Sequence, residues 1–178
     1  MPFTPFHFGP AILLGLLLLK KLDFPTFVAA NVAVDWRAFL VFFGFWPEPL
    51  HSWQHSYLGA TVLSIALGSV MLYLRPYIEV LMQEFMIEQS FSPKSIFLAA
   101  FSGTFLHVTL DAFHHPSMPT FLPLNMRPLF GLLSTSEVRA LTFSMMFLSI
   151  PVYIYVGLKS SKYSGADSLS EMFSRGTA

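Results

Sequence analysis

The sequence predicts an all-α membrane protein, a polytopic bundle of about four to five hydrophobic helices. Of its 178 residues, 54% are hydrophobic and only 11% are charged, whereas a soluble domain carries about 25% charged residues. The uncharged residues are also clustered in long stretches, which is how helical membrane proteins distribute their polarity. These stretches lie at 10–19, 24–34, 57–74, 95–106 and 140–158.

Length separates these stretches into full and partial spans, because a helix needs about 20 apolar residues to cross the hydrocarbon core. Segments 57–74 and 140–158 approach this length without charges. Segments 24–46 and 95–113 are long enough but carry acidic or basic residues, so we expect spans with polar interruptions. Segment 10–19 is about half as long and predicts a half-span, or a tilted helix completed by Phe6 and Phe8.

The remaining segments predict one domain with a tail. Residues 1–163 form the helical membrane domain, and 164–178, rich in Ser and Gly, are predicted to be a flexible cytoplasmic tail. Between the spans, 75–94 predicts a short loop or a helix at the membrane surface. Four prolines in 116–128 predict a structured loop without helix.

Basic residues predict the orientation in the cell membrane. When five segments alternate sides, seven basic residues fall on one side and two on the other, so the first side, with the C-terminus, is expected to be cytoplasmic. The seven are Lys20, Lys21, Arg75, Lys94, Lys159, Lys162 and Arg175, and the two are Arg127 and Arg139. All six histidines then lie at or near the opposite, non-cytoplasmic face.

Composition excludes several classes of function. The chain has no cysteine, which excludes disulfides, thiolate metal sites and iron–sulfur clusters, so any metal must be held by nitrogen and oxygen. Ten Lys and Arg balance ten Asp and Glu, so net charge does not attract nucleic acid and no such partner is expected. The expected surroundings are the lipid bilayer, with membrane-protein partners or a homo-oligomer.

Histidine and aspartate spacing predicts a metal site. His51 and His55 are four residues apart and would share one helix face, and His107 and Asp111 repeat this spacing on another helix. Asp35 lies within a predicted span, where an unpaired carboxylate is costly and a divalent cation relieves the cost. The expected metal ligands are His7, Asp35, His51, His55, His107 and Asp111.

Further residues are secondary candidates around this site. His114 and His115 follow Asp111 at i+3 and i+4, and Ser56 is placed to orient a histidine. Zinc is the expected metal, with iron, manganese or copper as alternatives. In a hydrolytic site Asp35 or Asp111 would act as the catalytic base, or one or both would be ligands. The competing interpretation is that the histidines are interface or helix-packing residues, with Arg37 as the partner of Asp35.

The order of these motifs resembles a known family. Met1 to His7, Asp35, His51 to Ser56, and His107-x-x-x-Asp111 on a small hydrophobic chain are similar to the membrane-bound metal-dependent hydrolases of bacteria and archaea. The match covers roughly residues 1–130. This family is in turn distantly similar to zinc-dependent phospholipases C, so the resemblance implies a mostly helical metal site and hydrolysis.

The chain departs from that family's pattern in two places. The family often has Pro-Asp-x-Asp where this chain has Val32-Ala33-Val34-Asp35, so one acidic ligand is missing and a two-metal site is put in doubt. The family also often has His-Arg-Gly-x-Thr-His-Ser, whereas residues 51–56 read His-Ser-Trp-Gln-His-Ser and lack the arginine. A phosphate-gripping arginine is therefore absent from this motif.

Three functions remain open from the sequence. The first is a membrane-embedded metal-dependent hydrolase acting on an amphiphilic substrate, such as a phosphoester or lipid, near the non-cytoplasmic face. The second is a non-catalytic accessory subunit of a larger membrane complex, with a structural metal site or none. The third is a di-iron membrane oxidase, since His51-x-x-x-His55 and Asp111-x-x-His114-His115 are similar to two histidine boxes of desaturases.

Overall fold

The computed structural model of the protein describes residues 5–47 and 52–175, and the side chains of 6–47 and 52–160. Within these ranges the chain forms six α-helices, one 3-10 turn and no strand, which confirms the all-α fold class. The elements are α1 (Pro5–Leu17), α2 (Phe24–Ala33), α3 (Trp36–Phe42), η1 (Trp53–His55), α4 (Tyr57–Glu84), α5 (Pro93–Ala112) and α6 (Thr135–Arg175).

Among the residues that the structure describes, three helices are long and apolar enough to cross a membrane, namely α4, α5 and residues 135–160 of α6. They contain most or all of three predicted spans, 57–74, 95–113 and 140–158. Only 28% of the apolar window of α4 and 17% of that of α6 are buried inside the protein. Their apolar side chains therefore face outward, as expected for helices surrounded by lipid. The orientation across the membrane stays a prediction.

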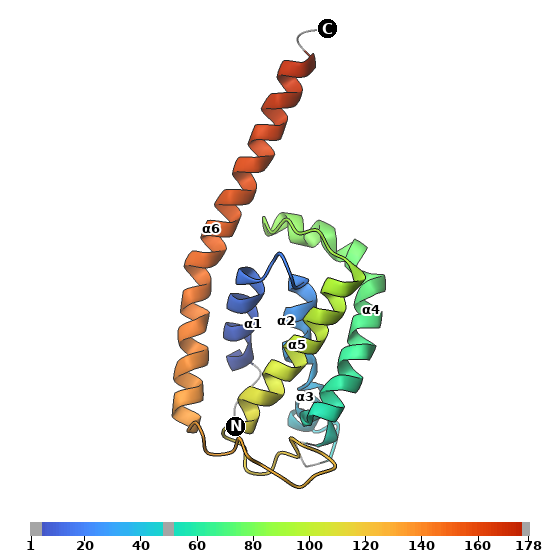
Figure 1. Ribbon diagram of the computed structural model, residues 1–178, viewed down its shortest axis with the longest axis vertical. Helices are drawn as coiled ribbons and strands as arrows, with labels where there is room; N and C mark the ends of the chain where they lie inside the picture. The colour runs from blue at the N-terminus through green and yellow to red at the C-terminus, as the bar shows by residue number, and fades with distance from the viewer. Residues whose placement is uncertain (1–4, 48–51, 176–178) are drawn as a thin grey trace.

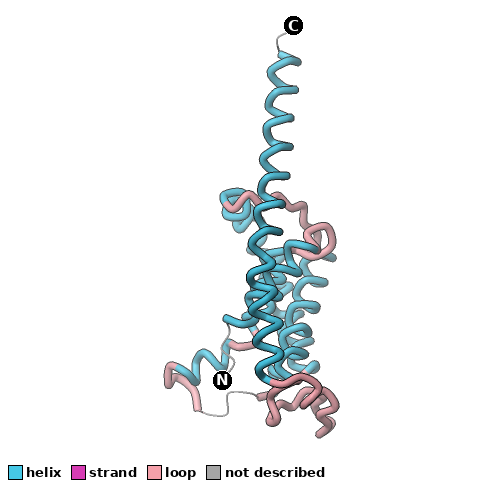
Figure 2. Tube along the Cα trace, turned by 90° about the vertical axis from the view of Figure 1, so that its left-hand side faces the viewer, coloured by secondary structure: helices cyan, strands magenta, loops and turns pink. Residues whose placement is uncertain are grey.

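The predicted continuous span over 24–46 is wrong. The chain forms two short helices there, α2 and α3, which are separated by Val34 and Asp35. Asp35 lies in a turn, with its amide bonded to the Val32 carbonyl at 3.0 Å, and its side chain is 7% exposed. The break lets this carboxylate point into the protein while α3 projects from the bundle (Figure 2).

The helices pack side by side in the order α6, α1, α2, α5 and α4 (Figure 1). The α1 helix has 13 residues, which include Phe6 and Phe8 but are too few to span alone. A glycine allows α1 to approach α6, because a Cβ atom at Gly9 would lie 2.1 Å from the carbonyl oxygen of Thr142. Glycine likewise lets α5 approach α2, since a Cβ atom at Gly103 would lie 2.6 Å from that of Ala30. Small residues at such crossings are typical of membrane helix packing.

Segment 75–94 contains the end of a long helix rather than a separate surface helix. The α4 helix continues through Pro76, and its last part turns across the end of the bundle (Figure 1). An interior proline removes a helical hydrogen bond and bends a helix. After a short loop, Ser92 caps α5 by accepting a hydrogen bond from the Ser95 amide at 3.1 Å.

Residues 113–134 form turns and loops without helix or strand, as the prolines of 116–128 predict. This connection lies at the end of the bundle where α4 and α6 begin (Figure 1). It is fastened by a hydrogen bond from the Tyr57 amide to the Thr120 carbonyl at 2.9 Å, and by Met118, which is buried in the core. The loop therefore closes this end of the protein.

The α6 helix extends well beyond the other helices and includes residues 164–175 (Figure 1). The sequence predicts a flexible tail over 164–178, whereas the structure has helix over residues 164–175. Its flexibility and its cytoplasmic location stay predictions.

Candidate metal centre

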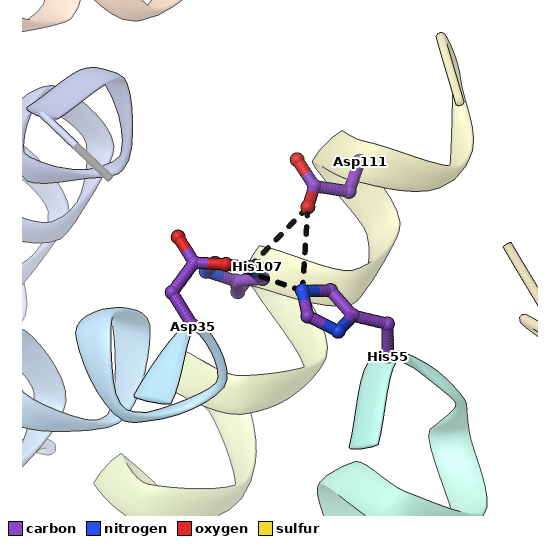
Figure 3. Close-up of side chains that lie close together, drawn as sticks. All are labelled: Asp35, His55, His107 and Asp111. Atoms are coloured by element: carbon purple, nitrogen blue, oxygen red, sulfur yellow. Dashed lines mark hydrogen bonds and ion pairs between the residues drawn. The ribbon is translucent and has the colours of Figure 1, made fainter. Parts of the chain in front are cut away.

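Four buried side chains from three segments meet at one end of the bundle (Figure 3). Asp35 comes from the break between α2 and α3, His55 from η1, and His107 and Asp111 from successive turns of α5. Each side chain offers one ligand atom, and these atoms all lie within 4.8 Å of one another. This Asp/His group could therefore hold a metal ion.

Distances between the ligand atoms agree with a small cation between them. The Nε2 atom of His55 lies 3.1 Å from Asp35 Oδ1 and 3.9 Å from Asp111 Oδ2. The Nε2 atom of His107 lies 3.4 Å from each of the same two oxygens. Ligand atoms bonded at 2.0–2.1 Å in a tetrahedral site are about 3.3 Å apart. The four measured distances lie on either side of this value.

His107 is held as metal-ligating histidines usually are. Its Nδ1 atom lies 2.6 Å from the carbonyl oxygen of Asn31, and because a carbonyl only accepts, Nδ1 carries the proton. In the neutral form that binds metals, the lone pair of Nε2 would then be directed into the Asp/His group, toward the oxygens of Asp35 and Asp111. Donation of the second ring N–H to a carbonyl orients a ligand and raises its basicity.

His55 is positioned by the start of α4. Ser56 caps this helix, accepting a hydrogen bond from the Gly59 amide at 3.0 Å and donating one to the Trp53 carbonyl at 2.6 Å. A Cβ atom at Gly59 would lie 2.1 Å from that same carbonyl oxygen, so the turn requires glycine there. Ser56 therefore bonds to the main chain of the turn that carries His55.

His7 lies against the outer side of the group. Its Nε2 atom is 3.1 Å from Asp111 Oδ1, the oxygen that does not face His55 and His107. Its ring stacks on that of His107 with 3.8 Å between centroids, and its side chain is buried. The first helix thus contributes a histidine to the same cluster.

The two histidines after α5 form a second group with Asp111. Ligand atoms of Asp111, His114 and His115 also lie within 4.8 Å of one another. Burial lowers the pKa of His114 below its ordinary value, which favours the neutral ring that a metal requires. Five of the six histidines therefore gather at one end of the bundle, as the sequence predicted.

Two further residues, His51 and Arg37, were considered for this site from the sequence. His51 lies outside the described residues, so its part in metal binding stays a prediction. Arg37, considered as a partner for Asp35, donates a hydrogen bond to the Pro47 carbonyl at 3.4 Å.

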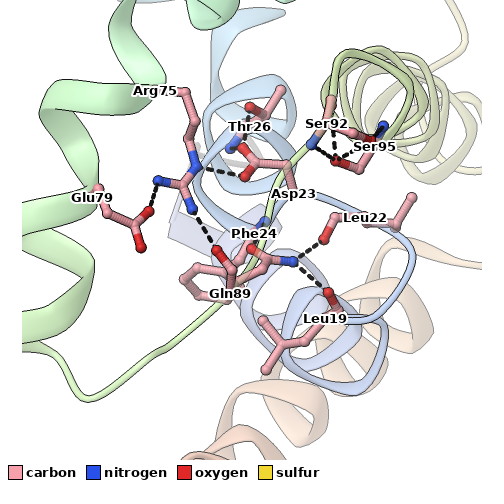
Figure 4. A network of polar contacts seen from close by, with 10 residues as sticks. All are labelled: Leu19, Leu22, Asp23, Phe24, Thr26, Arg75, Glu79, Gln89, Ser92 and Ser95. Carbon is pink, nitrogen blue, oxygen red and sulfur yellow. Dashed lines mark hydrogen bonds and ion pairs between the residues drawn. The ribbon is translucent and has the colours of Figure 1, made fainter.

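A second buried polar cluster, around Arg75 and Asp23, lies at the opposite end of the bundle (Figure 4). The sequence did not predict this cluster. Arg75 was counted as a loop charge, but its side chain is fully buried and its Nε donates to Asp23 Oδ2 at 2.6 Å. Gln89 accepts a hydrogen bond from the Phe24 amide at 2.8 Å. The available signal was Asp23 two residues before Pro25, a pattern that favours a helix cap.

No family model, curated protein or solved structure matches the chain. The class of protein is therefore described from the fold and the site alone. The described part of the chain is all-helical, with three helices long and apolar enough to span a membrane and a buried Asp/His group that could hold a metal ion.

Proposed function

We propose that the protein is a membrane-embedded, metal-dependent hydrolase that acts on an amphiphilic ester or phosphoester. The observation that supports this proposal most directly is the environment of the Nε2 atom of His107. This atom is fully buried and lies 3.4 Å from two carboxylate oxygens. These contacts are ion pairs while the ring is protonated, whereas a metal ion between the same three atoms would replace the ring proton and bind all of them.

Charge in the cluster also favours a divalent cation. Asp35 and Asp111 bring two carboxylates into one buried site, and His55 and His107 add no charge while they are neutral. Burying negative charge without compensation is expensive. Histidine nitrogen and carboxylate oxygen donors suit zinc, iron and manganese, and we propose zinc because this donor set is common in its hydrolytic sites.

Each carboxylate has a distinct part in the proposed reaction. A bound divalent ion would polarise the carbonyl or phosphoryl oxygen of the substrate and make water a better nucleophile. Asp111 is enclosed by histidines, so we assign it as a ligand. Asp35 directs one oxygen toward His107 and the other away from it (Figure 3). We therefore assign Asp35 as the base that accepts the proton from water.

A groove beside Asp35 supports an amphiphilic substrate. Its volume is about 390 Å³, and its lining residues are Val32, Ala33, Asp35, Trp36, Phe39 and Leu40. Asp35 is the polar member of an otherwise apolar wall, and Phe39 is 60% exposed. An alkyl or acyl chain in the groove would thus place its polar head beside the metal centre. A larger hollow, lined by Leu16 and Tyr155, lies at the other end of the bundle.

The metal centre is tested by metal analysis of the protein purified in mild detergent without chelators. We expect stoichiometric metal in wild type and its loss in His107→Ala and Asp111→Ala. Thr109→Val is the matched control, because Thr109 lies on the same helix and bonds Tyr57 outside the cluster. Wild-type protein without metal would refute both the centre and the hydrolase.

Hydrolysis is tested with fluorogenic esters and phosphoesters of short and long chain in mixed micelles. We expect turnover that chelation abolishes and zinc restores, and a loss of about 10²–10⁴-fold in kcat for Asp35→Asn. Leu40→Trp, which fills the groove, should lower kcat/KM for long-chain substrates while leaving short-chain turnover and metal content unchanged. Full metal content without turnover of any such substrate would refute the hydrolase and leave the metal centre standing.

A further inference from the structure

Asp111 belongs to two groups of possible metal ligands. Its Oδ2 faces His55 and His107, whereas its Oδ1 faces His7 at 3.1 Å. The group formed with His114 and His115 shares this carboxylate with the inner group that contains Asp35. A carboxylate has two oxygens and can therefore serve two cations at once.

The end of α5 holds both outer histidines near this carboxylate. The main-chain amides of His114 and His115 both donate to the Asp111 carbonyl, at 3.2 and 3.0 Å. The loop that follows is fastened to the same turn, because the Gly131 amide donates to the Phe113 carbonyl at 2.9 Å. The two imidazoles are thus kept beside Asp111 by the backbone.

His114 repeats the arrangement seen at His107. Its Nδ1 lies 3.0 Å from the Leu110 carbonyl, so Nδ1 carries the proton and Nε2 carries the lone pair. This Nε2 atom is buried and has no hydrogen-bond partner among the described residues. His114, like His107, therefore presents a possible ligand nitrogen on a ring that a backbone carbonyl has oriented.

We propose that Asp111 bridges two divalent cations, an inner one in the Asp35–His55–His107 group and an outer one held by His114 and His115. The acidic residue that Val32-Ala33-Val34-Asp35 lacks, which put a two-metal site in doubt, is not needed in this arrangement, because the outer histidines directly follow α5. This inference rests on the proposed function, since it needs the inner cation. Paired metal ions that share ligands about 3.5–4 Å apart are common in hydrolases and stabilise both attacking and leaving oxygens. The outer histidines are half-buried, whereas His55 and His107 are fully buried. The outer ion should therefore be released first by a chelator.

The experiment counts zinc in the purified full-length protein and records the electron paramagnetic resonance spectrum after manganese loading. We expect two equivalents of metal in wild type and an exchange-coupled manganese signal. His114→Ala and His115→Ala should each retain one equivalent and give the signal of isolated manganese. The matched control Thr109→Val should keep two equivalents and the coupled signal.

Three outcomes would overturn the inference, and they separate it from the proposed function. One equivalent in wild type that both outer variants retain refutes the second cation but leaves the inner centre intact. Two equivalents without exchange coupling refute the shared carboxylate. No metal in wild type refutes the inner centre as well. Because His114 and His115 are tested separately, and His115 is only partly buried, misfolding of one variant leaves the other as a measurement.

Discussion

At its two ends the bundle buries two polar clusters, and they differ in how far the chain itself supplies their partners. Ser95 and Asp111 mark these ends on α5, and sixteen residues of helix separate them by about 24 Å. At the first end Arg75 is bonded to Asp23, Glu79 and the carbonyl of Gln89. At the second end the carboxylates of Asp35 and Asp111 share the buried imidazoles of His55 and His107, with His107 Nε2 at 3.4 Å from an oxygen of each.

This difference distinguishes a cluster whose charges are paired within the chain from a cluster that could bind a metal ion. In the Arg75 cluster a positive charge faces two negative charges, and the guanidinium also lies 4.4 Å from the ring centre of Phe91. In the Asp/His cluster the two carboxylates face histidine nitrogens only, and all four groups could be metal ligands. The first should therefore determine stability under all conditions, and the second only when an ion is present.

The largest expected effect is on the Arg75 cluster. Arg75→Met leaves the fully buried Asp23 carboxylate without its ion-pair partner. Breaking a buried pair in this way costs about 3–5 kcal/mol, so we expect the free energy of unfolding to fall by that amount. The measurement is an unfolding titration with denaturing detergent from mild-detergent micelles.

The control for this prediction is Arg139→Met, which removes an exposed arginine near Phe6. We expect its unfolding midpoint to differ little from that of wild type, because exposed charges contribute about 0–1 kcal/mol. Equal midpoints for the two variants would show that the Arg75 cluster is not the structural one.

The second largest effect is the increase in the free energy of unfolding that zinc should cause at the Asp/His cluster. Zinc at 100 times its Kd should raise the free energy of unfolding by about 2.7 kcal/mol, because only the folded protein presents the site. The increment should vanish in His107→Ala. It should persist in Glu79→Gln, since changes at distant sites are additive. An equal zinc increment in His107→Ala would place the ion elsewhere.

The smallest effect concerns the contact that orients His107. A Cβ atom in Gly103→Ala would lie 2.9 Å from the Phe27 carbonyl and 3.1 Å from Asn31 Nδ2, so α2 must shift away from α5. This shift moves the Asn31 carbonyl that holds His107, and we expect about tenfold weaker zinc binding, as for other changes behind a metal ligand. Competition titration with a chromophoric chelator measures it. Gly157→Ala on α6, whose added Cβ atom would lie 3.8 Å from that of Met86, should bind zinc as wild type does.

Much of the fold could be predicted from the sequence because its signals are local. Apolar runs such as 140–158 extend over enough residues to predict a long helix, and the i, i+4 spacing of His107 and Asp111 predicts a shared helix face. Alternation of the spans then predicts that the histidines meet at one end. The helix break at Asp35 was not predicted, because an apolar segment that contains one acidic residue still has the length and composition of a single span.

The missed features depend on residues far apart in the chain. The partner of Arg75 is Asp23, 52 positions away, and the carbonyl that orients His107 belongs to Asn31, 76 positions away. No local pattern shows whether a charge in or beside an apolar segment is exposed or paired, so Arg75 was counted as a surface charge. For the same reason the sequence could not separate an inner ligand group from an outer one.

The sequence by itself therefore determined that this protein is helical and apolar, and that its nitrogen and oxygen ligands lie near one end, because composition and helical periodicity are properties of the chain. Only the tertiary structure decided which of these ligands face one another. It also decided which nitrogen of His107 points inward and that Asp35 leaves its helix to meet them. The physical reason is that packing of α2 against α5 brings a backbone carbonyl, a carboxylate and two imidazoles within hydrogen-bonding distance, and no segment contains that contact on its own.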